Sequence, residues 1–289
     1  MEAQKPNTQQ ATRPAAAAPA KKAPVGKEPQ KSNVRGIKNA IWVIVGCIAI
    51  AVLVFIFVFG NPANFEDAAK KMPKNLLGTI YSGGFIVPIL QGLFLTVIAL
   101  AVERFIAISS AMGKGNNTKF VARVKKLLGE GKIEEARKEC AKQKGTVGAV
   151  VDAALIKYTE MHNSTELTKE QKLTTLQQTI EEATALEMPA LQENLPILAT
   201  LTTLGTLIGL LGTVIGMIKS FQALAQSGAP DSTELSKGIS EALVNTAFGI
   251  LTAAFAVISY NYYTNKIDKV TYAIDEVGFS IVQTFAATH

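Results

Sequence analysis

A run of 22 residues without a charge limits what this chain can fold into more than any other feature. Residues 39–60 read NAIWVIVGCIAIAVLVFIFVFG and follow a polar, lysine-containing segment. About 20 apolar residues in a helix are enough to cross the hydrocarbon core of a bilayer, and no element of a soluble domain accounts well for so long an uncharged run. The run therefore predicts a transmembrane helix, with Trp42 as an anchor at one interface.

Three more apolar segments follow, and together they predict an all-α membrane protein with four spans. The segments are 79–110, 196–223 and 238–263, and hydrophobic residues make up 48% of the chain. Pro88 and Gln91 interrupt the first of the three, which is tolerable where neighbouring helices cover them. A chain with three spans, in which 39–60 is something else, is the alternative.

The segments between the spans are polar. Residues 1–38 are rich in Ala, Pro, Gln and Lys and cannot build a core, so they predict a disordered basic tail. Residues 111–195 predict a helical domain with two short amphipathic helices, a turn between them at Gly129–Gly131, and one long helix. The remaining segments are loops at 61–78 and 224–237 and a terminal helix at 264–289.

Lysine and arginine predict the side of the membrane that each segment occupies. Residues 1–38 carry eight of them, whereas the loop at 61–75 carries three. Because positive residues favour the cytoplasmic side, we expect both chain termini and the helical domain at 111–195 in the cytoplasm. The two short loops then lie outside.

The third span contains GTLIGLLGTVIGM, in which glycines and threonines interrupt an apolar run. At about 100° per residue, four glycines fall on one stripe of the helix: Gly205, Gly209, Gly212 and Gly216. Small residues on one stripe let two membrane helices approach closely, because packing drives their association in lipid. Close packing is the main role that we expect for these glycines.

Polar side chains also form stripes on the last two spans. Beside the glycines lie Thr202, Thr206 and Thr213, and the fourth span carries Glu241, Asn245, Thr252 and Ser259 on one face, with Thr246 on a neighbouring face. A single threonine usually bonds its own backbone one turn back, and an acid near a span end is compatible with the headgroup level. An ionisable residue in a membrane helix is nevertheless a functional-site candidate. Two polar stripes on adjacent helices indicate a surface that faces a pore or a polar partner.

Residues that could carry enzymatic or metal chemistry are sparse. Cys47 and Cys140 lie far apart in the sequence, and His162 and His289 are isolated. No spacing typical of metal ligands and no pairing of a nucleophile with a base is visible. We therefore expect neither an enzyme nor a metal or cofactor site.

Two segments of the last spans, GLLGTVIGMIKSF (209–221) and GISEALVNTAFGILTAAFAVISYN (238–261), resemble the MotA/TolQ/ExbB proton channel family. Within that family they resemble ExbB and TolQ more than MotA. ERF at 103–105 and GKIEEARKEC at 131–140 are similar to the first core helix and the cytoplasmic domain of the family, so the resemblance covers roughly residues 84–265. The span at 39–60 and the tail before it are additions to that core. Thr206 and Phe255 stand where the family usually has proline.

The resemblance implies a multi-pass protein of the bacterial inner membrane that is not an enzyme. Such proteins form a ring, taken to be a homopentamer, around a dimer of an ExbD-like single-span protein whose aspartate is protonated and released. The work passes to a TonB-like protein that serves outer-membrane transport. By position, Thr213 and Thr246 would face the pore, and Glu241 would match a family acid near the outer end of the last span. To this predicted proton pathway we add Thr206, Asn245 and Thr252 of the polar stripes.

Several other functions stay open at this point. The chain could be a TolQ-like or gliding-type motor subunit, a non-conducting membrane scaffold, or a small-solute transporter. Transporters often carry internal repeats, and no repeat relates the first two spans to the last two, which counts against that reading. No nucleic-acid partner is expected.

Overall fold

The computed structural model describes residues 39–66, 72–226 and 232–288, and the tail predicted at 1–38 lies outside them. Within these residues the protein is helical, apart from turns and one isolated bridge between Phe65 and Pro73. Four helical segments are long and apolar enough to cross a membrane, which confirms the predicted helical architecture with four candidate spans. In chain order the helices are α1 (Ala40–Val54, continued by a π-helical turn at Phe55–Phe59), a 3₁₀ turn (Pro62–Asn64), α2 (Leu76–Ser82), α3 (Ile86–Ala111), α4 (Asn117–Gly129), α5 (Ile133–Gln143), α6 (Gly145–Asn163), α7 (Lys169–Gln192), α8 (Leu195–Gln226) and α9 (Ser232–Thr288).

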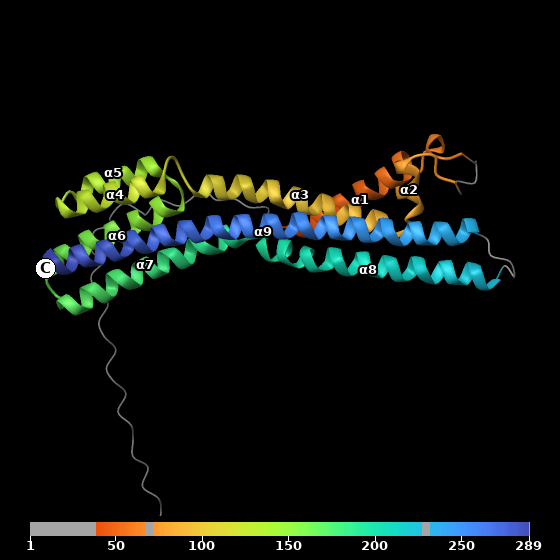
Figure 1. Ribbon diagram of the computed structural model, residues 1–289. Helices are drawn as coiled ribbons and strands as arrows, with labels where there is room; N and C mark the ends of the chain where they lie inside the picture. Colours follow the sequence, from red (N-terminus) through yellow and green to blue (C-terminus); the bar gives the residue numbers. More distant parts are fainter. Residues whose placement is uncertain (1–38, 67–71, 227–231, 289) are drawn as a thin grey trace, which may run out of the picture.

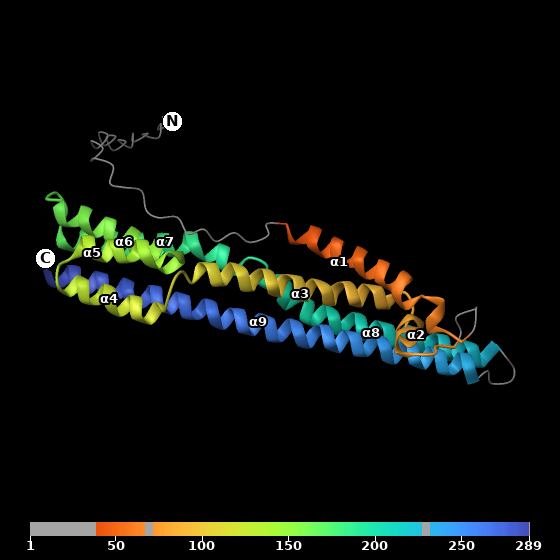
Figure 2. The same ribbon diagram turned by 90° about the horizontal axis from the view of Figure 1, so that it is seen from above.

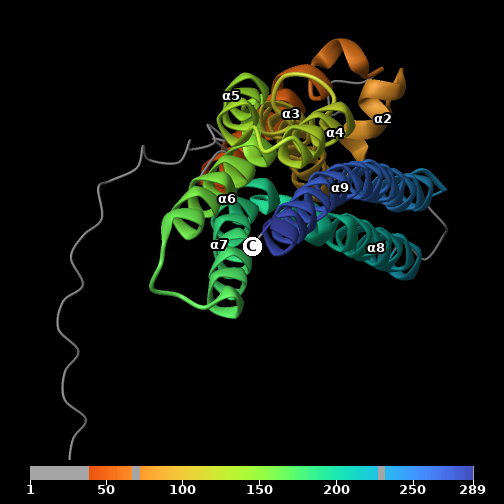
Figure 3. The ribbon, with the colours of Figure 1, turned by 90° about the vertical axis from the view of Figure 1, so that its left-hand side faces the viewer.

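The helices form an elongated bundle organised around α9 (Figures 1 and 2). α9 runs the whole length of the bundle, and α8 lies beside its first half in the opposite direction. α3 lies between α1 and the α8–α9 pair, so α1 is at the periphery. At the other end of the bundle, α4, α6 and α7 lie around the C-terminal part of α9, as the end view in Figure 3 shows.

The segment expected as one helix at 79–110 is divided into α2 and α3. The break lies at Gly83 and Gly84, and Gly84 has a φ of +78°, a left-handed conformation that glycine adopts without a steric cost. α3 then runs unbroken from Ile86 to Ala111 through Pro88, because Pro88 lies in its first turn, where the missing N–H has no helical partner in any case. The break brings the α2–α3 turn against α9.

The fourth span and the terminal helix, which the sequence divides at 263, form a single helix. Buried apolar residues continue along α9 at intervals of three or four, which keeps one face of the helix packed beyond the apolar span: Tyr263, Ile267, Val270, Ile274, Val277, Ile281 and Phe285. Within 250–277 the sequence has neither glycine nor proline to end the helix. The same helix therefore serves both the membrane half and the helical domain.

The helical domain is built from α4 to α7 and the end of α9. α4 ends at Gly129 and α5 begins at Ile133, with Gly131 between them at a φ of +72°. α7 begins with a capping box, in which the Thr168 hydroxyl accepts a bond from the Gln171 N–H and the Gln171 side chain accepts one from the Thr168 N–H. The amphipathic faces of these helices enclose a core that includes Val124, Leu155 and Phe285.

A buried charge cluster joins the membrane half to the helical domain. Arg104 of α3 is fully buried and forms an ion pair with its neighbour Glu103. It also donates to the carbonyl oxygens of Ala190 (3.3 Å) and Leu191 (3.4 Å) at the end of α7. The last carbonyls of a helix have no helical partner, so Arg104 satisfies groups that the break between α7 and α8 leaves open. Asn194, at a φ of +64°, forms that break.

Candidate functional site

The glycines of the third span face α9. Each is buried, and a Cβ atom added at any of the four would lie 3.1 Å or less from an atom of α9: Gly205, Gly209, Gly212 and Gly216. At Gly216 the added atom would lie 2.8 Å from the Ala242 nitrogen and from the Gly238 oxygen, which are backbone atoms that cannot turn aside. These glycines therefore set the distance between α8 and α9.

Two glycines of α9 complete this seam, and the sequence analysis did not single them out. A Cβ atom at Gly249 would lie 2.8 Å from the Gly209 Cα atom, and one at Gly238 would lie 2.9 Å from the Gly216 oxygen. Gly238 and Gly249 are eleven residues apart, which places them on one face of a helix. We call these six residues (205, 209, 212, 216, 238 and 249) the glycine seam.

Beside the glycine seam, the hydroxyl groups of Thr213 and Thr246 contact each other across the two helices. The Thr213 hydroxyl donates to the Gly209 carbonyl at 3.2 Å, so its oxygen is left to accept the proton of the Thr246 hydroxyl. Both side chains are half-buried, and the neighbouring surface is apolar, with Leu210 and Leu243 exposed. The pair is a small polar spot on an apolar face.

The other two threonines predicted for the pathway bond their own helices. Thr206 is exposed and donates to the Thr202 carbonyl at 3.3 Å. Thr252 is fully buried against Gly205 and donates to the Phe248 carbonyl at 2.8 Å. Such bonds one turn back satisfy the hydroxyl without a partner on another helix, so neither threonine takes part in the Thr213–Thr246 contact.

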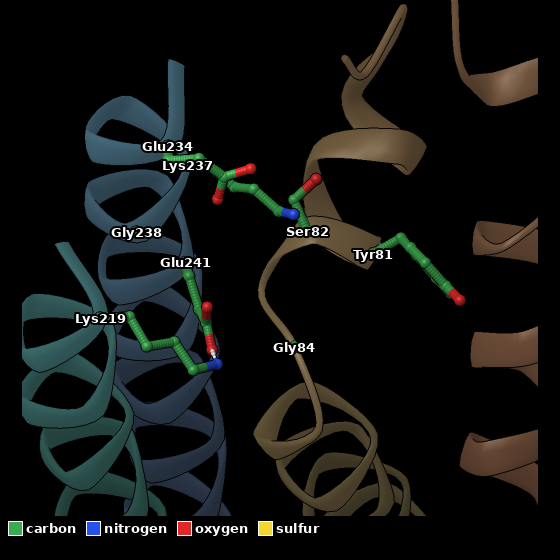
Figure 4. Close-up of a pocket in the computed structure, with 8 residues that line it drawn as sticks. All are labelled: Tyr81, Ser82, Gly84, Lys219, Glu234, Lys237, Gly238 and Glu241. Atoms are coloured by element: carbon green, nitrogen blue, oxygen red, sulfur yellow. Dashed lines mark hydrogen bonds and ion pairs between the residues drawn. The ribbon is translucent and has the colours of Figure 1, made fainter. Parts of the chain in front are cut away.

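Glu241 lies nearer the end of the bundle, in an ion pair that the sequence analysis missed. Its carboxylate oxygen is 2.5 Å from the ammonium nitrogen of Lys219 on α8 (Figure 4). The Glu241 side chain is 6% exposed and that of Lys219 is 46% exposed, so the acid is buried and the base is about half-exposed. Gly84 covers the acid, because a Cβ atom there would lie 2.5 Å from the carboxylate oxygen. The α2–α3 turn thus closes over Glu241.

Asn245 lies one turn further along α9 and holds the same turn. Its side-chain nitrogen donates to the Gly83 carbonyl at 3.0 Å, and the side chain is fully buried against Gly212. Its side-chain oxygen has no hydrogen-bond partner within the described residues. Glu241 and Asn245 therefore form one group beneath the turn between α2 and α3.

A cavity of about 420 Å³ opens beside the ion pair. Its charged lining consists of Lys219, Glu234, Lys237 and Glu241, and Figure 4 shows Lys237 pointing toward Ser82, while Tyr81 points away from Glu241. Its lining residues belong to α2, the α2–α3 turn, the end of α8 and the start of α9. In Figure 1 these elements meet at the end of the bundle that is remote from the helical domain. Within the described residues, no group of three or more His, Cys, Asp or Glu side chains could hold a metal ion.

The structure therefore divides the six residues predicted for a proton pathway. Thr213 and Thr246 meet at the surface of the α8–α9 pair, whereas Glu241 and Asn245 are buried under the α2–α3 turn. Thr206 and Thr252 belong to neither group. Lys219, which the sequence analysis did not single out, pairs with Glu241.

Comparison with known proteins gives one match to a family model and several matches to individual proteins. Residues 148–276 match a sequence model described as the MotA/TolQ/ExbB proton channel family. The Tol-Pal system protein TolQ of Haemophilus influenzae is 38% identical over 86 residues, which are 29% of this chain and 37% of TolQ. The biopolymer transport protein ExbB of Salmonella typhimurium is 33% identical over 85 residues, which are 29% of this chain and 35% of ExbB.

A longer match joins the chain to an archaeal protein. The putative biopolymer transport protein ExbB homolog of Methanothermobacter thermautotrophicus is 26% identical over 199 residues, 67% of this chain and 66% of that protein. The chain spans well under half the length of the TolQ and ExbB proteins above. The matched region at 148–276 contains α7, α8 and the glycine seam, and over this region the chain is similar to the MotA/TolQ/ExbB proton channel family.

Proposed function

We propose that this chain is an ExbB-like subunit of a motor that conducts protons across the bacterial inner membrane and turns the proton-motive force into mechanical work. In this proposal it forms a ring, a homopentamer, around a dimer of an ExbD-like single-span protein, and the work passes to a TonB-like protein. Its termini and the helical domain would lie in the cytoplasm.

The observation that carries the proposal is the contact between Thr213 and Thr246 on an otherwise apolar face. A half-exposed hydroxyl pair has no good neighbour among lipid tails, since lipid offers no hydrogen bond. A helix of another chain with a protonatable carboxylate would satisfy it. The oxygens of the pair can accept a hydrogen bond from a protonated carboxyl group. A hydroxyl that turns away from its partner within the protein can donate to the ionised form.

Glu241 takes a different part in this proposal. Since Lys219 pairs with it at 2.5 Å, Glu241 is the fixed charge at the outer end of the pathway rather than the group that carries the proton. Asn245 holds the α2–α3 turn over it. One elementary charge that crosses a potential of 100 mV releases about 2.3 kcal/mol, and we assign its transfer to a carrier on the partner chain.

A TolQ-like motor is the second candidate, and the match to TolQ of Haemophilus influenzae, at 38% identity, favours it as much as the ExbB match favours the first. Both candidates need a single-span partner and a ring. They differ in the protein that receives the work, so co-purification with a TonB-like or a TolA-like protein separates them.

The test is proton flux into vesicles that contain the chain together with an ExbD-like single-span protein that co-purifies with it. Thr213→Val and Thr246→Val should each lower the flux about tenfold or more, because a hydrogen bond to a charged group is worth about 1.5–3 kcal/mol. Thr203→Val, which changes an exposed threonine elsewhere on α8, is the matched control. Normal flux in both Thr213→Val and Thr246→Val, with the partner still bound, would refute conduction through this pair and favour a scaffold.

A further inference from the structure

A second cavity, of about 290 Å³, lies between α3 and α9 near the helical domain. Its walls are the end of α3, with Phe105 and Ser109, the turn that follows α3, and one face of α9, with Tyr262, Tyr263 and Lys266. It is remote from the glycine seam and from the Lys219–Glu241 pair, so the proposed function does not use it.

This cavity lies where the exposed surface changes from apolar to polar. On α3 the exposed apolar side chains end with Phe105 (55% exposed) and Ile106 (64% exposed), and the next exposed large hydrophobic residue along the chain is Leu167. On α9 the closely spaced exposed apolar residues end with Tyr262, and Lys266 follows one turn later. Further along α9 only Tyr272 and Phe279 are exposed large hydrophobic residues. Aromatic rings followed by a lysine are typical of the interface between lipid tails and headgroups.

Lys266 is the charged group of the cavity, and its ammonium lies over the ring of Tyr262 at 5.5 Å from the ring centre. No carboxylate among the described residues forms an ion pair with it. The exposed side chain of Ser109 adds a hydroxyl on the opposite wall. A cation without a protein counter-charge, a hydroxyl and two aromatic rings are complementary to a phosphate group that carries acyl chains.

From these contacts we propose that the cavity binds the headgroup of an anionic phospholipid in the leaflet next to the helical domain. The phosphate would lie between Lys266 and Ser109, and the acyl chains would run along the exposed apolar residues of α3 and α9. The proposal needs only that the apolar helices lie in a bilayer, and it is independent of proton conduction.

Native mass spectrometry of the full chain in detergent, titrated with short-chain lipids, tests the proposal. Dihexanoyl phosphatidylglycerol should bind more tightly than dihexanoyl phosphatidylcholine, and inorganic phosphate should not bind. Lys266→Gln should weaken phosphatidylglycerol binding about fivefold, the contribution of one lysine at an anionic surface. Lys266→Arg should retain it, and Lys269→Gln, which changes an exposed lysine outside the cavity, should have no effect.

Three results would overturn the proposal. Equal binding of the two lipids would show that headgroup charge is not recognised. Equal effects of Lys266→Gln and Lys269→Gln would place the lipid elsewhere or show that another copy of the chain fills the cavity. Binding of inorganic phosphate alone, as tight as that of the lipid, would assign the site to a free anion.

Discussion

The glycine seam predicts that one added methyl group at Gly216 loosens the α8–α9 pair. In Gly216→Ala the new Cβ atom would lie 2.8 Å from two backbone atoms of α9, whereas ordinary contacts begin at 3.4 Å. The helices would have to move apart by about 0.6 Å at this point, and overpacking of this kind costs about 1–3 kcal/mol. Alanine also favours a helix over glycine by about 1 kcal/mol, which opposes the loss.

Gly46→Ala is the control that separates these two effects. Gly46 lies inside the apolar helix α1, and a Cβ atom added there has no atom within 4 Å. Both variants gain the same helix preference, so the difference between their unfolding midpoints reports packing alone. We expect Gly216→Ala to unfold at a lower temperature than Gly46→Ala, by roughly 2–4 °C for each kcal/mol of overpacking.

The assay is thermal unfolding of both variants and the parent chain in one detergent at one scan rate. A fixed scan rate is needed because unfolding of a membrane protein of this size is often irreversible. Equal shifts of the midpoint in the two variants would refute tight packing at the seam, because Gly216 would then tolerate a methyl group as well as Gly46 does, where no atom lies nearby. A larger loss in Gly216→Val than in Gly216→Ala would support it further.

Two other predictions concern charge and titration. Lys219→Met should lower the unfolding midpoint more than the double variant Lys219→Met/Glu241→Gln, because the single change leaves a buried carboxylate without its cation. Since Lys219 is 46% exposed, the loss of stability should be smaller than the about 3–5 kcal/mol typical of fully buried pairs. Equal midpoints of the single and double variants would contradict this prediction. Burial, with a smaller effect of the nearby Asp152 charge, raises the pKa of the Cys140 thiol to about 12, so in a Cys47→Ala background iodoacetamide should not label the folded chain at pH 9. Because the pKa of Cys140 is higher in the folded chain than in the unfolded chain, its contribution to stability should be fully present below the unfolded pKa of about 8.5. That contribution should be lost as the pH rises toward 12. Rapid labelling of the folded chain would disprove the burial of Cys140.

The fold was largely predictable because lipid leaves few choices. A bilayer requires about 20 apolar residues in each spanning helix, so 39–60, 196–223 and 238–263 identify their spans by length and composition alone. The length of α9 was not predictable in the same way. The polar residues after 263 indicate where the membrane ends, but the helix continues because its buried face keeps the same spacing from Tyr263 to Phe285.

The candidate site was predictable in its residue types and not in its contacts. Asn245 donates to a carbonyl 162 residues earlier in the chain, a contact that no local pattern indicates. The contacts between α8 and α9, however, follow a simple rule. In each contacting pair, the residue on α8 lies about as many positions before the connection between the two helices as the residue on α9 lies after it. The pairs are Gly209 with Gly249, Thr213 with Thr246, and Lys219 with Glu241. An antiparallel pair with a constant register has this property, so the glycine spacing alone could have identified Gly249 and the partner of Glu241.

The register also places the charges of the membrane half. Within the four candidate spans the stretches 40–60, 86–102, 195–218 and 242–265 carry no Asp, Glu, Lys or Arg. The ion pairs Lys219–Glu241 and Glu103–Arg104 lie directly at the borders of three of these stretches. A charged side chain at the middle of a bilayer costs about 2.5–3.5 kcal/mol even by insertion measurements. It would also attract a mobile proton carrier of opposite charge and keep that carrier at one depth in the membrane. Between these ion pairs the four stretches carry only neutral side chains, and the contact between Thr213 and Thr246 bridges α8 and α9 there. A titratable carboxylate supplied by another chain could pass such a surface in either protonation state.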